Sequence, residues 1–144
     1  MTQTAILYPV FVQVALTFAL QIWMRIERVG AVKRGEVAFG DISLRQPKWP
    51  ARATQISNAF HNQLETPILF YAVVAFIMIT SQVNVVFVVL AWLFVAFRLI
   101  HAYIHTGPNK QPYRAYSYLA ASAVLLVMWV LFAIRIMFFT ATGA

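Results

Sequence analysis

Apolar residues gather into four long runs that are separated by shorter polar segments. The runs extend over Ala5–Ile26, Thr54–Thr80, Val85–Ile104 and Tyr116–Phe139. Each run is close to the roughly 20 apolar residues that a helix needs to cross the hydrocarbon core of a bilayer. The pattern predicts an all-α membrane protein, a bundle of four transmembrane helices over about residues 5–28, 54–80, 85–105 and 115–139.

The composition agrees with a membrane protein of one domain covering residues 1–144. The chain is 62% hydrophobic and only 10% charged, whereas soluble domains usually carry about 25% charged residues. A soluble enzyme and a disordered tail are therefore excluded. The sequence contains no cysteine, so a thiol nucleophile, cysteine-ligated zinc and an iron–sulfur cluster are excluded as well. Any thiol in a reaction must come from a substrate.

The net charge of +7 could suggest nucleic-acid binding, but the basic residues lie in the loops between the apolar runs. Those around the two longer loops are Arg25, Arg28, Lys33, Arg34, Arg45, Lys48 and Arg52, and then Arg98, Lys110 and Arg114. Loops rich in Lys and Arg stay in the cytoplasm. We therefore expect no nucleic-acid partner, both basic loops in the cytoplasm and both termini on the opposite side. The compact loops favour a bacterial inner membrane.

Ionisable residues inside the spans indicate where the helices meet. Glu65 precedes the short turn at Ser81–Asn84 by about 16 residues, and Arg98 follows it by about 14. At ~1.5 Å per residue, both lie roughly 21–24 Å from the outer level of that turn. Charged groups at such depth usually face a bundle interior or a functional cavity. We expect Glu65 and Arg98 to share one depth in the inner half of the membrane.

Further polar residues stand at helical spacing around these two positions. The second span carries Asn58, Asn62 and Glu65, the third carries Arg98, His101 and His105, and the fourth begins with Arg114 and Tyr118. Residues three, four and seven apart share one face of a helix. The spacing predicts a polar, mostly basic pocket between three helices that opens toward the cytoplasm.

Two other interpretations of these residues follow from the sequence. Glu65 and Arg98 could form a buried ion pair that fixes two helices. His61, Glu65, His101 and His105 also have the spacing of metal sites in helix bundles. Only one acidic residue lies within the spans, so we predict no metal. Pro67 is expected to kink the second helix near Glu65.

Three motifs resemble those of the MAPEG family, the membrane-associated proteins in eicosanoid and glutathione metabolism. Residues Asn62–Glu65 resemble its N-x-x-E signature, Arg98–His105 resemble its R-x-x-H-x-x-x-Y segment, and Pro112–Tyr118 resemble its P-x-R-x-x-x-Y segment. The spacing from Arg98 to Arg114 is most similar to the microsomal glutathione transferase and prostaglandin E synthase branch.

The resemblance implies a homotrimer that binds glutathione as a co-substrate between neighbouring subunits. Arg114 matches the catalytic arginine that holds the glutathione sulfur as a thiolate. Asn62 and Glu65 match residues that bind the tripeptide, with Glu65 near its amino group. Other positions that correspond to the glutathione site are Arg98, His101, Tyr118, Asn58 and His105. The last two stand where animal enzymes carry an arginine and a tyrosine.

The resemblance also suggests the activity. We expect a glutathione-dependent transferase or peroxidase that acts on hydrophobic electrophiles or lipid hydroperoxides within the membrane, with membrane lipids around it. Ala115 replaces the serine of prostaglandin synthases, which argues against prostaglandin isomerase activity. The alternative is a non-catalytic MAPEG-like membrane protein with a structural or partner-binding role, which Asn58 and His105 favour.

Overall fold

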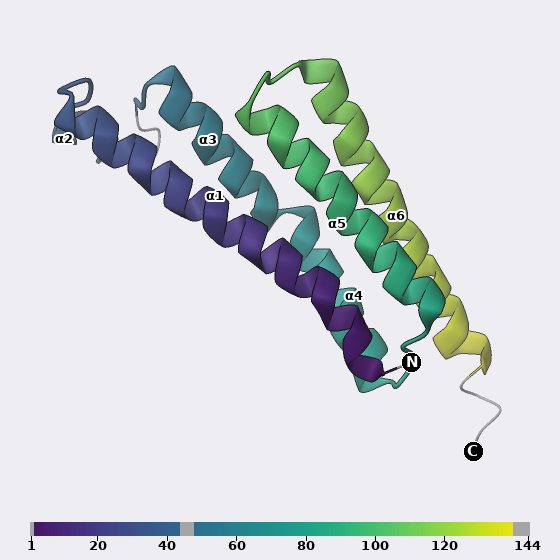
Figure 1. Cartoon of the computed structure of the whole chain (residues 1–144). Helices are drawn as coiled ribbons and strands as arrows, with labels where there is room; N and C mark the ends of the chain where they lie inside the picture. The colour runs from purple at the N-terminus through teal and green to yellow at the C-terminus, as the bar shows by residue number, and fades with distance from the viewer. Residues whose placement is uncertain (1, 44–47, 140–144) are drawn as a thin grey trace.

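A computed structural model describes residues 2–43 and 48–139 of the chain, and Arg45 of the first basic loop lies outside them. The described residues form helices and no strand. In chain order the elements are η1 (Gln3–Ile6), α1 (Leu7–Lys33), α2 (Phe39–Ile42), α3 (Ala51–His61), η2 (Asn62–Leu64), α4 (Thr66–Ile79), α5 (Val85–Thr106) and α6 (Gln111–Phe139) (Figure 1).

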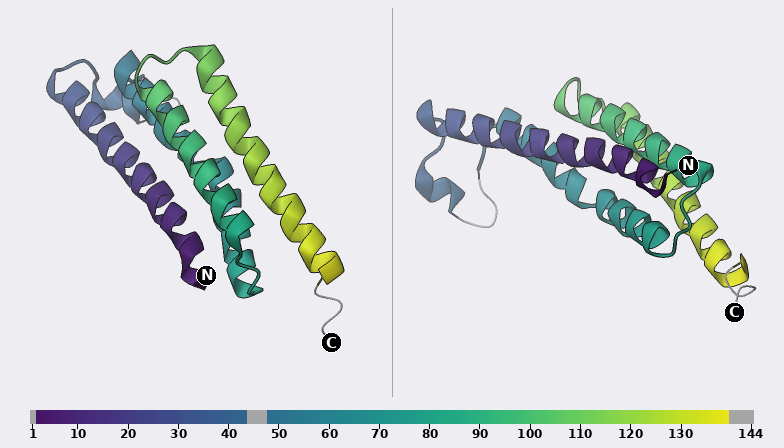
Figure 2. Two further views of the ribbon diagram at one scale, coloured as in Figure 1. Left: turned by 45° about the vertical axis from the view of Figure 1, so that its right-hand side comes forward. Right: turned by 60° about the horizontal axis from the view of Figure 1, so that its bottom comes forward.

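Four helical segments are long and apolar enough to cross a membrane, namely Gln3–Lys33, Ala51–Ile79, Val85–Thr106 and Gln111–Phe138. The predicted class, a four-helix membrane bundle, is confirmed. The helices run along a common direction, with the α1–α3 and α5–α6 connections at one end of the bundle (Figures 1 and 2). The start of α1, the α4–α5 turn and the end of α6 lie at the other end. Both basic loops are therefore on the same side, as their charge predicts.

The hydrophobic core joins α4, α5 and α6 in the half of the bundle that contains the α4–α5 turn. Phe70 of α4 stacks on Phe94 of α5, with ring centroids 4.5 Å apart, and both side chains are fully buried. At the start of α5, the Asn84 side chain accepts hydrogen bonds from the main-chain N–H groups of Val86 and Phe87 at 2.9 and 3.3 Å. This N-cap supplies partners that the first turn of a helix otherwise lacks.

The second span is not the single helix that the apolar run predicts. Helix α3 ends at His61, a 3₁₀ turn follows, and Glu65 has φ −95° and ψ −104°, outside the helical region, before α4 begins at Thr66. Pro67 is the second residue of α4. Proline lacks an N–H and its ring clashes with the preceding turn. The predicted distortion at Pro67 is therefore confirmed, but it is a break between two helices and not a kink.

A buried pair of amides fixes α1 against this break. Gln13 of α1 donates from Nε2 to Gln63 Oε1 at 2.9 Å, and Gln63 Nε2 donates to the carbonyl of Ala59 at 3.3 Å. The two glutamines are 0% and 1% exposed. Buried polar side chains need such partners, because a polar group that is removed from water without a hydrogen bond is costly. The pair therefore sets the position of the residues that follow α3.

Candidate functional site

Arg98 binds the main chain at the helix break. Its Nη2 donates to the carbonyl of Asn62 at 2.8 Å, and the side chain is 0% exposed. The sequence predicts one depth for Glu65 and Arg98, and the bond of Arg98 is to Asn62, three residues before Glu65. Arg98 thereby joins α5 to the irregular segment of the second span.

The alternative of a buried Glu65–Arg98 ion pair is wrong. Within residues 2–43 and 48–139 the ion pairs are Arg34–Glu36 and Arg52–Glu27. Glu65 is exposed and accepts a hydrogen bond from Asn62 Nδ2 at 3.1 Å. The reason is the break itself, because the spacing rule for one helical face holds only along an uninterrupted helix.

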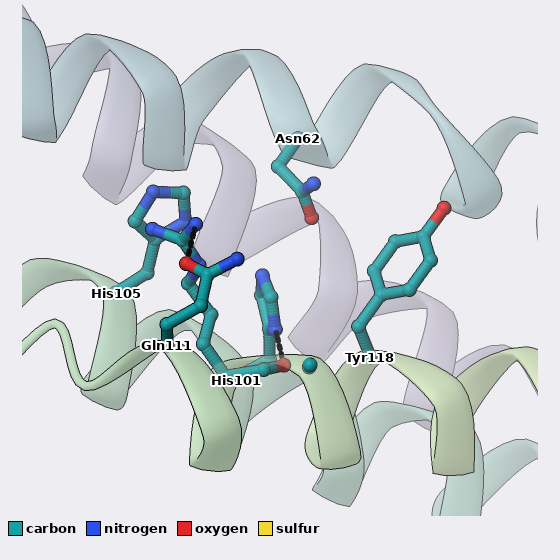
Figure 3. A pocket seen from close by; sticks show the side chains of 7 residues that line it. Asn62, His101, His105, Gln111 and Tyr118 are labelled. Carbon is teal, nitrogen blue, oxygen red and sulfur yellow. Dashed lines mark hydrogen bonds between the residues drawn. The ribbon is translucent and has the colours of Figure 1, made fainter.

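A cavity of about 200 Å³ lies beside this level, between η2, α5 and α6. Its lining consists of Asn62, His101, His105, Gln111, Arg114, Ala115 and Tyr118. In Figure 3 the Asn62 side chain points across the cavity toward His101 and Tyr118, while His105 and Gln111 lie on the other side of His101. The cavity is close to the α5–α6 connection, because its lining includes Gln111 and Arg114 in the first turn of α6.

His101 is held in one orientation by α6. Its Nδ1 lies 3.0 Å from the carbonyl oxygen of Arg114 (Figure 3). The same atom lies 3.3 Å from Ser117 Oγ. Because a carbonyl can only accept, Nδ1 carries the proton in this contact. In the neutral ring, Nε2 is then an acceptor, and this atom is buried without a partner among the described residues. The ring therefore presents a lone pair at the cavity.

Arg114 is held by uncharged groups. Its Nη1 donates to Asn109 Oδ1 at 2.7 Å, and its Nη2 donates to Gln111 Oε1. Asn109 has a positive φ of 49°, a conformation that asparagine tolerates better than most residues. No carboxylate is among the residues that line the cavity. The two amides thus orient the guanidinium without neutralising its charge.

Several polar atoms at this level are buried and have no hydrogen-bond partner in the described part of the chain. They are Asn62 Oδ1, Arg98 Nε and Nη1, His101 Nε2 and His105 Nδ1. Buried polar groups are almost always satisfied in native proteins. A ligand or ordered water that fills the cavity can supply the missing partners. The mixture of cationic donors and neutral acceptors suits a ligand that is anionic overall and carries donors of its own.

The structure brings together most of the residues that the sequence singled out. Five of them line the cavity, namely Asn62, His101, His105, Arg114 and Tyr118. Arg98 lies at the same level through its bond to Asn62, and Glu65 is one hydrogen bond away from the lining. Asn58 is exposed and is not among the lining residues. The role of each residue toward a ligand stays a prediction.

Sequence reasoning missed three polar contributors. Gln111 both lines the cavity and binds Arg114. Ser117 is buried behind His101, and Gln63 is held by Gln13. The position of Ser117, three residues after Arg114 on the same helical face, is a signal that could have identified it. The Gln13–Gln63 contact joins distant parts of the chain and leaves no local pattern.

The metal alternative has no support in the described residues. Within residues 2–43 and 48–139, no three His, Asp or Glu side chains lie together so that they could hold a metal ion. His61 is exposed, and its Nδ1 lies 3.3 Å from Ser57 Oγ. It is therefore not grouped with His101 and His105 as the metal hypothesis requires.

Comparison with known proteins identifies a family for almost the whole chain. The model of the MAPEG family matches residues 6–134. No curated protein and no solved structure gives a significant match. The matched range contains all three motifs and every residue that lines the cavity.

Proposed function

The chain belongs to the MAPEG family, and on this premise we propose that it is a glutathione-dependent transferase or peroxidase of the membrane. The observation that carries the proposal is Arg114, a cation that is held by two neutral amides in a cavity without carboxylates. Glutathione is an anionic tripeptide with an amino group and a thiol. The charge of Arg114 suits its carboxylates, and unpartnered acceptors of the lining, such as Asn62 Oδ1 and His101 Nε2, suit its N–H groups.

Arg114 would act on the thiol. A free thiol has a pKa of about 8.5, so little of it is ionised at neutral pH. An adjacent positive charge favours the thiolate and lowers the thiol pKa, and a guanidinium stays charged throughout. Since the neighbours of Arg114 are neutral, its charge remains available to the sulfur. The chain has no cysteine, and the thiol comes with the co-substrate.

Two reactions follow from a stabilised thiolate. In transfer, the sulfur attacks an electrophilic carbon, a carbon–sulfur bond forms, and the leaving group departs with its electron pair. In reduction, the sulfur attacks a lipid hydroperoxide, the oxygen–oxygen bond breaks, and the released alkoxide takes a proton. The resulting sulfenic acid reacts with a second glutathione to give the disulfide and water. Hydrophobic substrates of both kinds reach the site through the lipid phase.

We further propose that the site is completed by a second copy of the chain, in a homotrimer. The cavity of about 200 Å³ is below the roughly 300–1,000 Å³ of usual ligand pockets. Glu65 and Asn58 are exposed in the single subunit, so they are free to contribute to a site at a subunit boundary. The basic loops would face the cytoplasm of a bacterial cell.

The non-catalytic alternative rests on Arg98. Its bond to the Asn62 carbonyl closes the helix break, and this is a structural role that needs no substrate. In that case the protein needs Arg98 and the Gln13–Gln63 pair to hold the helices together, and Arg114 has no function. The two proposals therefore differ in the expected effect of Arg114.

The test is calorimetric titration of glutathione into the detergent-purified protein, with Arg114→Ala and Arg114→Lys. Wild type is expected to bind, Arg114→Ala to lose at least about tenfold in affinity for a lost charged contact, and Arg114→Lys to bind with reduced affinity. Lys110→Ala is the control, since this exposed cation lies one turn away and does not line the cavity. If folded wild-type protein gives no signal with millimolar glutathione, the proposed enzyme activity is refuted and the structural role remains.

A further inference from the structure

Two grooves flank the end of α1 at the side of the bundle that holds the basic loops. One, of about 350 Å³, lies between α1, Phe39 of α2 and Trp49, and its apolar lining includes Val32. The other, of about 420 Å³, follows α1 itself from Lys33 back to Arg25. Val29 and Lys33 belong to both linings. The two grooves therefore meet at Lys33, the last residue of the helix.

The second groove runs toward the middle of the membrane. From Lys33 to Arg25 is eight residues, or about 12 Å along the helix. Ile26 and Val29 line it, and Phe39, which is 77% exposed, borders the first groove. Exposed apolar side chains beside the end of a membrane span are positioned to contact acyl chains, while tryptophan near the same level marks the boundary with the headgroups.

The charges at this end of the bundle are not balanced. Glu27 lies 3.9 Å from Arg52 and Glu36 pairs with Arg34 at 2.7 Å, while Asp41 accepts from the neutral N–H of Ala38 and has no ion pair in the described part of the chain. The side chain of Lys33 is exposed and has no hydrogen bond or ion pair within the described residues. A positive charge is thus left at the point where the two grooves meet.

Arg28 adds a second cation that is fixed in place. Its Nη2 donates to Ser57 Oγ at 2.7 Å, and its Cζ lies 5.0 Å from the centre of the Trp49 ring. These contacts hold the guanidinium beside the first groove. Its Nε is buried without a partner among the described residues. The contacts of Arg28 are all neutral, so its charge is also uncompensated.

We propose that the end of α1 binds one anionic phospholipid from the surrounding membrane. The phosphate lies between Lys33 and Arg28, and the two acyl chains lie in the two grooves. The grooves select a lipid over free phosphate, because apart from the cations their lining is largely apolar. The negative headgroup is selected over a zwitterionic one because it compensates two charges that the protein leaves unpaired. This site is separate from the cavity at Arg114 and does not depend on glutathione.

The test is native mass spectrometry of the full chain in detergent, with phosphatidylglycerol and phosphatidylcholine of identical acyl chains added in competition. A cation near a lipid surface contributes about fivefold to binding of an anionic lipid. We expect wild type to prefer phosphatidylglycerol by roughly twentyfold or more for two cations. Lys33→Ala is expected to lose about fivefold of this preference, and Lys33→Glu to abolish it. Lys110→Ala, an exposed cation at the same bundle end, is the control and is expected to keep the full preference.

Two further arms separate the parts of the proposal. Phe39→Ala is expected to weaken the binding of both lipids to a similar extent, because it removes contact with the chains and no charge. Inorganic phosphate at millimolar concentration is expected to leave phosphatidylglycerol bound. Equal binding of both lipids by wild type overturns the proposal, as does an unchanged preference in Lys33→Glu. The proposal is also overturned if Lys110→Ala loses as much of the preference as Lys33→Ala does. In that case the preference depends on the net charge of the protein and not on a site at Lys33.

Discussion

The Gln13–Gln63 pair allows a quantitative test of how the helix break is held. Replacing Gln13 with methionine keeps an unbranched side chain of similar length and removes the donor to Gln63 Oε1, now at 2.9 Å. Hydrogen bonds between membrane helices average about 0.6 kcal/mol and reach about 1.7 kcal/mol. An acceptor left unpaired in a buried site adds a cost of about 1–3 kcal/mol. Gln13 Oε1 is itself buried without a partner in the described part of the chain. Because methionine also removes this unsatisfied acceptor, we expect a net loss of only about 1–2 kcal/mol in unfolding free energy.

A double-mutant cycle isolates the interaction from the other effects of each substitution. Gln63→Met should also cost about 1–2 kcal/mol, since it removes in addition the bond to the Ala59 carbonyl. The double variant is expected to be more stable than the sum predicts by about 1 kcal/mol, because the second substitution removes the unpaired group left by the first. Unfolding in mixed micelles with increasing dodecyl sulfate, followed by tryptophan fluorescence and circular dichroism, measures all four proteins.

Gln21→Met is the matched control. Gln21 lies on the same helix, is only partly buried and has no side-chain hydrogen bond in the described part of the chain. Its substitution is expected to change the free energy of unfolding by less than about 0.5 kcal/mol. Additive single effects, to within about 0.3 kcal/mol, would refute the reasoning, and so would equal effects of Gln13→Met and Gln21→Met.

Three further predictions concern other parts of the molecule. Arg114→Ala should raise the pKa of the bound glutathione thiol by about 1–3 units, which titration of thiolate absorbance at saturating glutathione measures; an unchanged value would exclude Arg114 as the thiolate partner. Asn84→Ala should lower the free energy of unfolding by about 0.5–2 kcal/mol, since it removes the N-cap of α5. An unchanged free energy of unfolding in the same micelle assay would contradict this. The hydrogen bond and charge of Arg34 hold the pKa of Glu36 below its ordinary value. The Arg34–Glu36 ion pair therefore forms above that lowered pKa and dissociates as the pH falls through it. Carbon NMR should show that the pKa of Glu36 is higher in Arg34→Gln than in wild type.

Regular helix geometry explains what the sequence could predict. Apolar runs locate the spans, and counting residues from the turn at Ser81–Asn84 predicts one depth for Glu65 and Arg98. The structure joins Arg98 to Asn62, three residues before Glu65. The same regularity groups His101 with His105 on one face of α5, and both line the cavity. These inferences need only a constant rise and rotation per residue.

The remaining features depend on contacts between distant parts of the chain. The side chain of Glu65 is exposed because its backbone is not helical, with φ −95° and ψ −104°. The spacing rule assumes a helical backbone and therefore does not predict this. The orientation of His101 depends on a carbonyl of α6, and the burial of Gln63 depends on Gln13 of α1. Pro67 predicts an irregularity in the second span, but proline alone does not determine whether a helix bends or ends. Contacts from other helices, such as the bond of Arg98 to the carbonyl of Asn62, also act on the break.

The break in the second span also has a consequence for how the protein is made. Helix α4 contains 14 residues, or about 21 Å, less than the roughly 30 Å of a bilayer core. It cannot cross the membrane alone, so Ala51–Ile79 must enter as one hydrophobic segment. The bond between Arg98 and the carbonyl of Asn62 forms only when Arg98 arrives on a segment synthesised later. Insertion thus precedes completion of the site, and substitutions that slow helix association should leave a full-length, correctly inserted chain that lacks the cavity.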